Sequence, residues 1–261
     1  MSMSESKPRV LLLGDIDHAP ARSAYDSLSS LAHLITPQST NPADFLQECQ
    51  SGAFNGTKAI YRTFGSVSIT GRIEGEIVKT LAEAGVRFIA HNGAGYDQID
   101  IPTCTSHKIH VSNTAPPALA AATADTALFL LLAALRNFNP AILSLRAGAW
   151  RGGPTTLAPL GHDPYGKTLG ILGMGGIGRN LAGKAAALGM NVTYHNRRQL
   201  PPADEGGARY VDFETLLEGS DVLSLNVPLN EKTKGMIGKE EFAKMKRGAV
   251  VVNTARGGGC G

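Results

Sequence analysis

Three glycines at fixed spacing carry the clearest chemical signal in this chain. Gly173, Gly175 and Gly178 lie between an apolar run, typical of a strand, and the residues that open the following helix. In this setting the first glycine allows a tight turn, the second lets the backbone approach a pyrophosphate, and the third allows close helix–strand packing. Free N–H groups at the helix start would then face the phosphates. An ordinary glycine-rich turn is the alternative. The expected cofactor contacts are Gly173, Met174, Gly175, Gly176, Ile177 and Gly178.

The residues after the second strand of this unit indicate which dinucleotide binds. Sites that prefer NAD usually carry an acidic residue here, which binds the ribose 2′-hydroxyl. This chain has Asn196, Arg197 and Arg198 instead. Two guanidinium groups can pair with a 2′-phosphate through charge-assisted hydrogen bonds. We therefore expect NADP(H) to be favoured over NAD(H), with a solvated surface turn as the alternative role of the arginines.

Two further segments are candidates for binding an anion. Gly93, Ala94 and Gly95 follow a predicted strand, and their small side chains would let successive N–H groups converge on a carboxylate. A plain glycine-rich turn fits these residues equally well. Arg256 directly follows the apolar run 249–253, at the strand end where open α/β sheets bind ligands. Its guanidinium can donate two hydrogen bonds to one carboxylate. Taken alone, such an arginine is more often a solvated surface cation.

The elements that must position these residues alternate along the chain. In the first part, short apolar runs are separated by amphipathic stretches, a pattern typical of parallel β–α–β units. A breaker cluster at 112–117 precedes a long apolar helix over 118–137, which we expect to join two domains. Five strands are then predicted, one short of a six-stranded doubly wound sheet, at 169–172, 192–194, 209–211, 221–227 and 249–253. The expected fold class is α/β, with domains at 1–117 and 118–261.

Composition narrows the function classes. The chain has 261 residues, of which 43% are hydrophobic and 18% charged, which is ordinary for a globular protein with two modest domains. A net charge of +3 without extended basic blocks predicts no nucleic-acid partner. Three widely spaced cysteines match neither a disulfide framework nor a metal site, so we expect reduced thiols and a cytoplasmic location. The apolar run 127–135 is too short to span a bilayer, so no membrane partner is expected.

Four segments together resemble the D-isomer-specific 2-hydroxyacid dehydrogenases. They are residues 92–100, the glycine turn 169–179, residues 221–228 and residues 252–258. The Asn-Arg-Arg turn is most similar to the glyoxylate and hydroxypyruvate reductase branch. The resemblance implies a flavodoxin-like substrate domain, a Rossmann cofactor domain, and hydride transfer between NAD(P)H and a small 2-keto or 2-hydroxy acid. It also implies a homodimer.

The resemblance assigns roles to matching residues. It implies that the loop from Gly93 to Gly95 binds the substrate acid. It makes Arg256 catalytic, because the matching arginine holds the substrate carboxylate and polarises the keto oxygen. The pocket that selects the keto acid would include Arg62, Thr63 and Phe64. The further cofactor contacts it implies are Val227, Pro228, Thr254 and Ala255.

The chain departs from the family pattern at its end. Keto-acid reduction needs a proton for the oxygen, and the family supplies it from a histidine paired with a glutamate, both beyond the segment that matches 252–258. None of the seven histidines here occupies that position, and we expect structural or solvated roles for His91 and His195. Our expectation is a C-terminally truncated member whose Rossmann domain lacks its last strands, with little turnover. The alternatives are a corepressor-like dinucleotide-binding protein and a non-functional truncated product.

Overall fold

The computed structural model describes residues 7–14, 19–114, 116–149 and 160–260. The chain divides into two compact units, 1–115 and 116–261, and each is described by itself. The sequence places the boundary two residues later, because Pro116 and Pro117 resemble helix breakers. In the structure both prolines lie in the first turn of a helix, where the missing proline N–H is tolerated.

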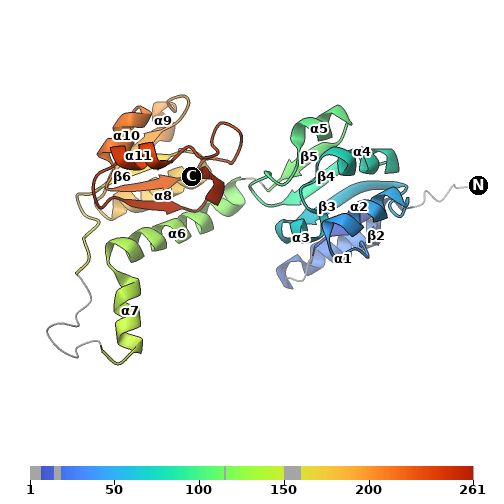
Figure 1. The fold of residues 1–261 in the computed structure, drawn as a ribbon, viewed down its shortest axis with the longest axis horizontal. Helices are drawn as coiled ribbons and strands as arrows, with labels where there is room; N and C mark the ends of the chain where they lie inside the picture. Colours follow the sequence, from blue (N-terminus) through green and yellow to red (C-terminus); the bar gives the residue numbers. More distant parts are fainter. Residues whose placement is uncertain (1–6, 15–18, 115, 150–159, 261) are drawn as a thin grey trace, which may run out of the picture. The chain divides into compact units, whose positions relative to one another are not determined.

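The first unit is built on a parallel sheet with the strand order β2-β1-β3-β4-β5 (Figure 1). Its strands are β1 Arg9–Leu13, β2 His33–Ile35, β3 Thr57–Thr63, β4 Phe88–Asn92 and β5 His110–Asn113. This is the order of flavodoxin-like folds, which confirms the expected class. Strand β1 is apolar throughout its centre because Leu11 and Leu13 pack on one face of the sheet and Val10 and Leu12 on the other.

Helices cover both faces of this sheet. Phe45 and Leu81 pack on the face that carries Leu11 and Leu13, and Leu28 packs on the opposite face. The carboxyl ends of the strands are therefore the natural place for polar loops. The helices are α1 Arg22–Leu31, α2 Pro42–Gln50, α3 Val67–Thr70, α4 Gly75–Ala84 and α5 Ile101–Ser106, with the 3-10 turns η1 Ala19–Ala21 and η2 Phe64–Ser66.

The second unit contains the other parallel sheet, with the order β10-β9-β6-β7-β8. Its strands are β6 Thr168–Leu172, β7 Asn191–His195, β8 Arg209–Tyr210, β9 Val222–Leu225 and β10 Val250–Asn253. All five strands expected in this part of the chain are therefore confirmed. The strand order reverses between β6 and β9, which makes this a switch point of the kind at which Rossmann sheets bind dinucleotides.

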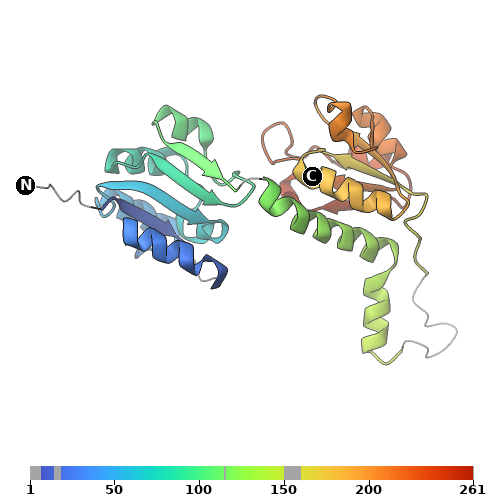
Figure 2. The ribbon, with the colours of Figure 1, turned by 180° about the vertical axis from the view of Figure 1, so that it is seen from behind.

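Two layers of helices enclose the second sheet (Figure 2). Leu131 from helix α6 Pro116–Leu135 and Leu181 from helix α8 Gly176–Ala187 belong to the cluster on one face, and Leu216 from helix α10 Phe213–Gly219 belongs to the cluster on the other. The remaining elements of the unit are α7 Phe138–Arg146, α9 Pro202–Glu205, α11 Lys239–Lys244 and the 3-10 turn η3 Gly257–Gly259.

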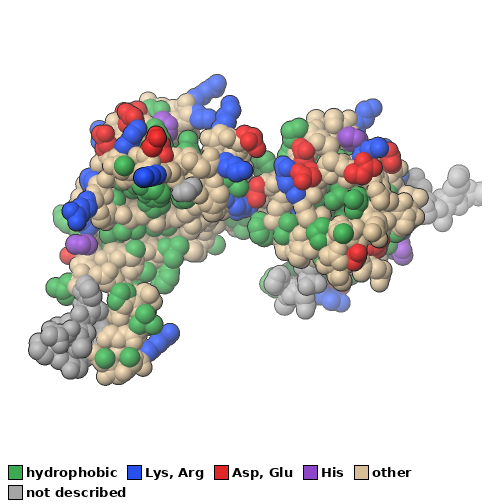
Figure 3. Space-filling view, in the orientation of Figure 1, with side chains coloured by type: hydrophobic (Ala, Val, Ile, Leu, Met, Phe, Trp, Pro, Cys, Tyr) green, Lys and Arg blue, Asp and Glu red, His purple; other side chains and the backbone are tan. Residues whose placement is uncertain are grey.

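The long helix predicted over 118–137 is present, but both of its predicted ends are wrong. It begins at Pro116, and it ends at Leu135 because Asn137 adopts a left-handed conformation with φ of 52°. Asparagine tolerates this conformation better than most residues. Helix α7 then begins at Phe138 and exposes large apolar side chains (Figure 3), among them Ile142, Leu143 and Leu145.

Helix α6 is more apolar than the run 127–135 alone suggests. Residues 118–135 have a mean hydropathy of 2.0, and by length and composition this segment could cross a membrane. A core helix passes the same test, and Ala124, Ala127 and Leu131 are buried in the core cluster shared with α8. Its apolar character is therefore explained in part by packing within the second unit.

Candidate functional site

The three carbonyl groups of the loop after β4 are each held by a hydrogen bond. The donors to the oxygens of Gly93, Ala94 and Gly95 are Thr114 N–H at 3.1 Å, Asn113 Nδ2 at 2.8 Å and His91 Nε2 at 2.9 Å. Within the described residues, the N–H groups of Ala94 and Gly95 have no protein acceptor. The loop therefore presents two consecutive N–H donors on a fixed backbone, which is a geometry that suits an anion.

Gly93 contributes shape to this loop and no free donor. Its N–H already bonds to His91 O at 3.0 Å. A Cβ at position 93 would lie 2.7 Å from His91 Nε2, and the His91 side chain is buried. Of the three residues predicted to bind a carboxylate, Ala94 and Gly95 thus offer the donors, and Gly93 allows the histidine to approach the loop.

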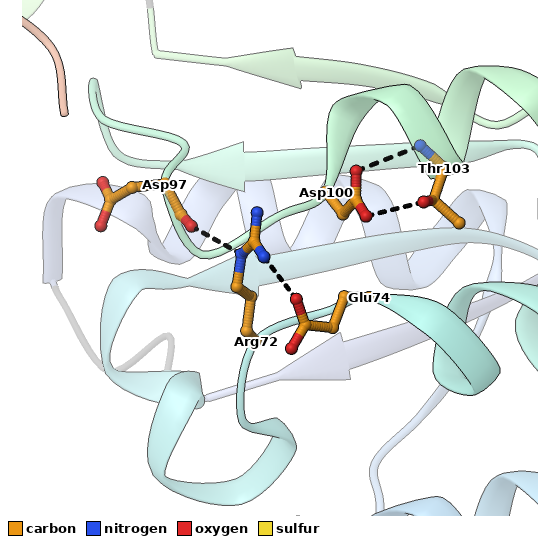
Figure 4. Close-up of polar contacts among 5 residues, drawn as sticks. All are labelled: Arg72, Glu74, Asp97, Asp100 and Thr103. Carbon is orange, nitrogen blue, oxygen red and sulfur yellow. Dashed lines mark hydrogen bonds and ion pairs between the residues drawn. The ribbon is translucent and has the colours of Figure 1, made fainter. Parts of the chain in front are cut away.

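Polar contacts also anchor the far end of the loop (Figure 4). Arg72 Nε donates to Asp97 O at 3.1 Å, and the Arg72 guanidinium forms an ion pair with Glu74. Asp100 caps helix α5 by accepting from Thr103 Oγ1 at 2.6 Å and Thr103 N–H at 3.1 Å. These two hydrogen bonds lower the pKa of Asp100. A carboxyl group that is held ionised is unsuited to be a general acid near neutral pH.

The residues expected to select the keto acid are placed differently from one another. Arg62 is fully buried, whereas Phe64 is 46% exposed. Thr63 lies at the end of β3 and is half-buried. Arg62 is therefore inaccessible to solvent in this structure, and the role in substrate selection that the resemblance implies for these three residues stays a prediction.

The glycine turn of the second unit joins β6 to α8. Gly173 has φ of +98°, and a Cβ there would lie 2.9 Å from the backbone of Asn226. A Cβ at Gly178 would lie 2.5 Å from Gly173 O, so the helix packs directly on the turn. Gly175 faces open space and begins α8 without a side-chain cap. The N–H groups of the first helical turn are thus left for an external acceptor.

Asn196 braces this turn from the end of β7. Its Oδ1 accepts a hydrogen bond from Met174 N–H at 2.7 Å, and its own carbonyl accepts one from Tyr210 OH at 3.2 Å. Met174 is also a buried side chain. Met174 thus offers no free N–H donor, and the predicted contact between Met174 and the cofactor stays a prediction. Arg197 and Arg198, the next two residues after Asn196, are exposed.

The first helical bond of α8 shows which predicted cofactor residues offer donors. Arg179 N–H bonds to Gly175 O at 2.9 Å. The N–H groups of Gly176, Ile177 and Gly178 precede it and therefore lack partners within the helix. These three positions, and the open space at Gly175, form the part of the turn that is suited to a pyrophosphate.

The strand ends on the other side of the switch point carry buried polar atoms. Asn226 Oδ1, after β9, and Thr254 Oγ1, after β10, are buried without a hydrogen-bond partner in the part of the chain described. Such atoms cost free energy unless a ligand or water satisfies them. Together with the open start of α8, they fit a bound dinucleotide. Asn226 was missed by the sequence analysis, and its position directly after β9 was the available signal.

Arg256 lies at the end of a turn that Asn253 organises. Asn253 Nδ2 donates to Arg256 O at 2.9 Å, and Asn253 Oδ1 accepts from Ala255 N–H at 3.0 Å. The guanidinium of Arg256 contacts Ala255 O at 2.9 Å. Val227, Pro228, Ala255 and Arg256 line one small pocket at the ends of β6, β9 and β10. The pocket therefore brings together four of the predicted residues, from the segments after β9 and β10.

The two histidines near these segments have structural hydrogen bonds. His91 supports the loop after β4, as described above. His195 Nδ1 contacts Val211 O at 2.9 Å, and its ring stacks on Tyr210 at a centroid distance of 5.9 Å. A carbonyl oxygen only accepts, so His195 carries its proton on Nδ1. Within the described residues, no group of three or more histidine, cysteine or acidic side chains is arranged to hold a metal ion.

A larger cavity of about 560 Å³ lies at the opposite end of the second sheet. Thr168, Asn191 and Arg209, which line it, stand at the amino ends of their strands. Parallel α/β sheets bind ligands at their carboxyl ends, so we locate the candidate site at the glycine turn despite the size of this cavity.

The comparisons with known proteins identify the family. Residues 128–260 match the model described as "D-isomer specific 2-hydroxyacid dehydrogenase, NAD binding domain". The chain belongs to the D-isomer-specific 2-hydroxyacid dehydrogenases. It is 48% identical over 250 residues to 4-methyl-2-oxopentanoate reductase A of Aspergillus oryzae, and the match covers 96% of this chain and 74% of that protein. It is 44% identical over 256 residues to glyoxylate reductase 1 of Saccharomyces cerevisiae, covering 96% and 72%.

Solved structures of 2-hydroxyacid dehydrogenases match this fold. A glyoxylate reductase from Paecilomyes thermophila superimposes with a TM-score of 0.90 at 48% identity, covering 98% of this chain and 75% of that one. The holo form of Rhodotorula graminis D-mandelate dehydrogenase gives a TM-score of 0.87 at 28% identity, covering 98% and 75%. The chain thus spans about three quarters of the length of these relatives. Its class, an NAD(P)-linked oxidoreductase with two α/β domains, is established by these matches.

Proposed function

We propose that the second unit binds NADP(H) in preference to NAD(H) and that the first unit binds a small 2-oxo acid of the glyoxylate or hydroxypyruvate type. The observation that carries this proposal is the uncapped start of α8. There the N–H groups of Gly176, Ile177 and Gly178 lack helical partners, and Gly175 leaves open space in front of them. Arg197 and Arg198 are exposed beside this turn and supply positive charge for a 2′-phosphate.

The substrate part of the proposal rests on the loop after β4. Its two consecutive N–H donors, on Ala94 and Gly95, suit one carboxylate, the group that all 2-oxo acids share. A bound nicotinamide would supply the hydride. For Arg256 we propose the role that the family resemblance assigns to it, because its guanidinium can donate two hydrogen bonds to one carboxylate. Relatives named for glyoxylate and for 4-methyl-2-oxopentanoate support the substrate class.

Isothermal titration of the full chain with NADPH and with NADH tests the cofactor proposal. We expect NADPH to bind about tenfold more tightly, since a paired 2′-phosphate is worth on the order of one tenfold step or more. Equal dissociation constants would reject the NADP(H) preference, and failure to bind either form would reject the cofactor site. Oxidation of NADPH with glyoxylate, hydroxypyruvate and 4-methyl-2-oxopentanoate then ranks the substrates.

We also propose a cytoplasmic homodimer without nucleic-acid or membrane partners. Exposed apolar side chains on α6 and α7, including Phe129, Leu143 and Leu145, support a protein interface. Burial raises the pKa of Cys49 to about 12 and that of Cys104 to about 11, so both thiols stay protonated near neutral pH. Light scattering coupled to size-exclusion chromatography measures the mass of the assembly.

A further inference from the structure

Arg62 is an unusual buried charge in the first unit. The whole residue is inaccessible to solvent, although it stands near the carboxyl end of β3. Its Nη2 donates to Gln98 Oε1 at 2.8 Å and its Nε to Ser66 Oγ at 3.2 Å. Its Nη1 is buried and has no hydrogen-bond partner in the described part of the chain. The guanidinium is thus held by neutral groups, and one of its donor nitrogens is unsatisfied.

No carboxylate lies within ion-pair distance of Arg62 among the described residues. The ion pairs found there involve other side chains, and Asp97 acts on Arg62 only through a weaker electrostatic attraction. Burial lowers the pKa of Arg62 to about 10, which still leaves it charged near neutral pH. Buried charges in proteins are normally paired, because an isolated one is costly. Among the described residues of the first unit, this positive charge therefore has no close counter-charge.

The position of this charge links it to the anion-binding loop. Arg62 pairs in register with His91 on the neighbouring strand, so the two side chains lie on the same face of the sheet, about 5 Å apart at the backbone. His91 donates to Gly95 O, and Gln98, three residues further along the same segment, accepts from Arg62 Nη2. His91, Gln98 and Arg62 are all buried polar side chains.

We propose that Arg62 supplies the electrostatic attraction for the substrate carboxylate at the N–H groups of Ala94 and Gly95, acting as a positioning residue through Gln98. This inference rests on the proposed function and deepens it, since it names the charge that the backbone donors lack. The bound carboxylate completes the charge balance of the cluster. Because the guanidinium is buried, it attracts the anion through a medium that screens charge less than water does.

Substitution of Gln98 separates this role from a purely structural one. Gln98→Glu keeps the shape of the side chain and brings a carboxylate to Arg62, which strengthens the contact that holds the loop. If Arg62 acted only as a structural tether, this variant would bind a carboxylate at least as well as the wild type. If its charge attracts the substrate, the internal carboxylate competes, and we expect the affinity to fall about tenfold.

The measurement is calorimetric titration of the full chain, saturated with NADP, with oxamate, a small unreactive analogue of a 2-oxo acid. We expect Arg62→Met to lose about tenfold or more in oxamate affinity and Arg62→Lys to recover part of it. Thr57→Val, a buried and nearly isosteric change at the other end of β3, is the control and should bind oxamate like the wild type. Circular dichroism and NADPH affinity, which reports on the other unit, verify that each variant is folded.

The outcomes distinguish this inference from the proposed function. A wild type that binds oxamate, beside Gln98→Glu and Arg62→Met variants with unchanged affinity, would overturn the inference alone. That result would show that the charge of Arg62 does not act on the bound carboxylate. A folded wild type that binds NADPH but no oxamate would overturn the substrate half of the proposed function, and the inference with it. If Arg62→Met does not fold, the Gln98→Glu result decides.

Discussion

Asn196 and Arg197 are neighbours in the sequence but have different relations to the glycine turn. Asn196 points its Oδ1 at Met174 N–H and so fixes the shape of the turn from within. Arg197 and Arg198 are exposed, and within the described residues no hydrogen bond joins either side chain to the turn. At the residue scale, shape and cofactor choice are thus separable, because one depends on a buried contact and the other on surface charge.

This separation predicts different effects for substitutions at neighbouring positions. Asn196→Ala should weaken NADPH and NADH to the same extent and lower the free energy of unfolding by about 1 kcal/mol, since Met174 N–H loses its partner. The double change Arg197→Ala with Arg198→Ala should weaken NADPH alone, by about tenfold. Titrations with both nucleotides measure this, with exposed Arg247→Ala as the control. Equal weakening of NADH by the double change would contradict the assignment.

Gly93 gives a second prediction at this scale. Gly93→Ala places a methyl group 2.7 Å from His91 Nε2, so the ring must move and its bond to Gly95 O is lost. We expect the free energy of unfolding to fall by about 1–3 kcal/mol and oxamate binding to weaken, with NADPH affinity retained. Gly183→Ala, where a Cβ meets open space on α8, is the matched control and should be neutral or slightly stabilising. Retained oxamate affinity in Gly93→Ala would show that the loop tolerates the shift.

Among the elements, Asp221 ties the start of β9 to two other segments. Its Oδ2 accepts from Thr168 N–H at the start of β6, at 2.8 Å, and its Oδ1 pairs with Lys246 Nζ, beyond α11, at 3.0 Å. Burial by itself raises the pKa of Asp221, but the hydrogen bonds from Thr168 and Lys246 outweigh it, so the pKa is lowered overall. The carboxylate therefore stabilises the fold in its ionised form.

The sign of this shift predicts how stability depends on pH. A folded-state pKa below the unfolded value of about 3.8 means that the unfolded chain binds the proton more readily. The stabilisation is thus fully present above about pH 4 and is lost as the pH falls further. Asp221→Asn should lower the melting temperature at pH 7 and reduce the acid-induced loss of stability. The control is Asp125→Asn, which removes an exposed ion pair with Lys184. Parallel acid profiles for wild type and Asp221→Asn would refute this prediction.

The sequence was sufficient for the elements whose signal is local. Apolar runs predicted all five strands of the second sheet, and the flavodoxin-like order of the first followed from the family resemblance. Helix α7 was missed because the end of helix α6 depends on the left-handed backbone of Asn137, and a single asparagine does not predict that conformation. The bracing role of Asn196 and the burial of Arg62 were also missed. Both features depend on contacts between residues that are distant in sequence. Composition and motif spacing do not predict such contacts.

For the molecule as a whole, the distribution of exposed apolar surface is the property that bears on assembly. In the second unit, Phe129 of α6 is 60% exposed, and Leu143 and Leu145 of α7 are 56% and 60% exposed. Helix α6 has one face packed on α8, so its outward residues are not needed for the core of its own unit. Exposed apolar residues grouped on two consecutive helices favour association, because their burial removes apolar surface from water.

The homodimer proposal therefore predicts that charge on α7 separates the subunits. Each buried leucine contributes about 1.5–3 kcal/mol, and a glutamate in its place must also be desolvated, so Leu143→Glu with Leu145→Glu should shift the dimer to monomer at micromolar concentration. Light scattering coupled to size-exclusion chromatography measures the mass across a dilution series. Leu31→Glu, an exposed leucine of α1 in the first unit, is the control and should leave the mass unchanged. A wild type that is monomeric at all concentrations, or a double variant that stays dimeric, would exclude α7 as the interface.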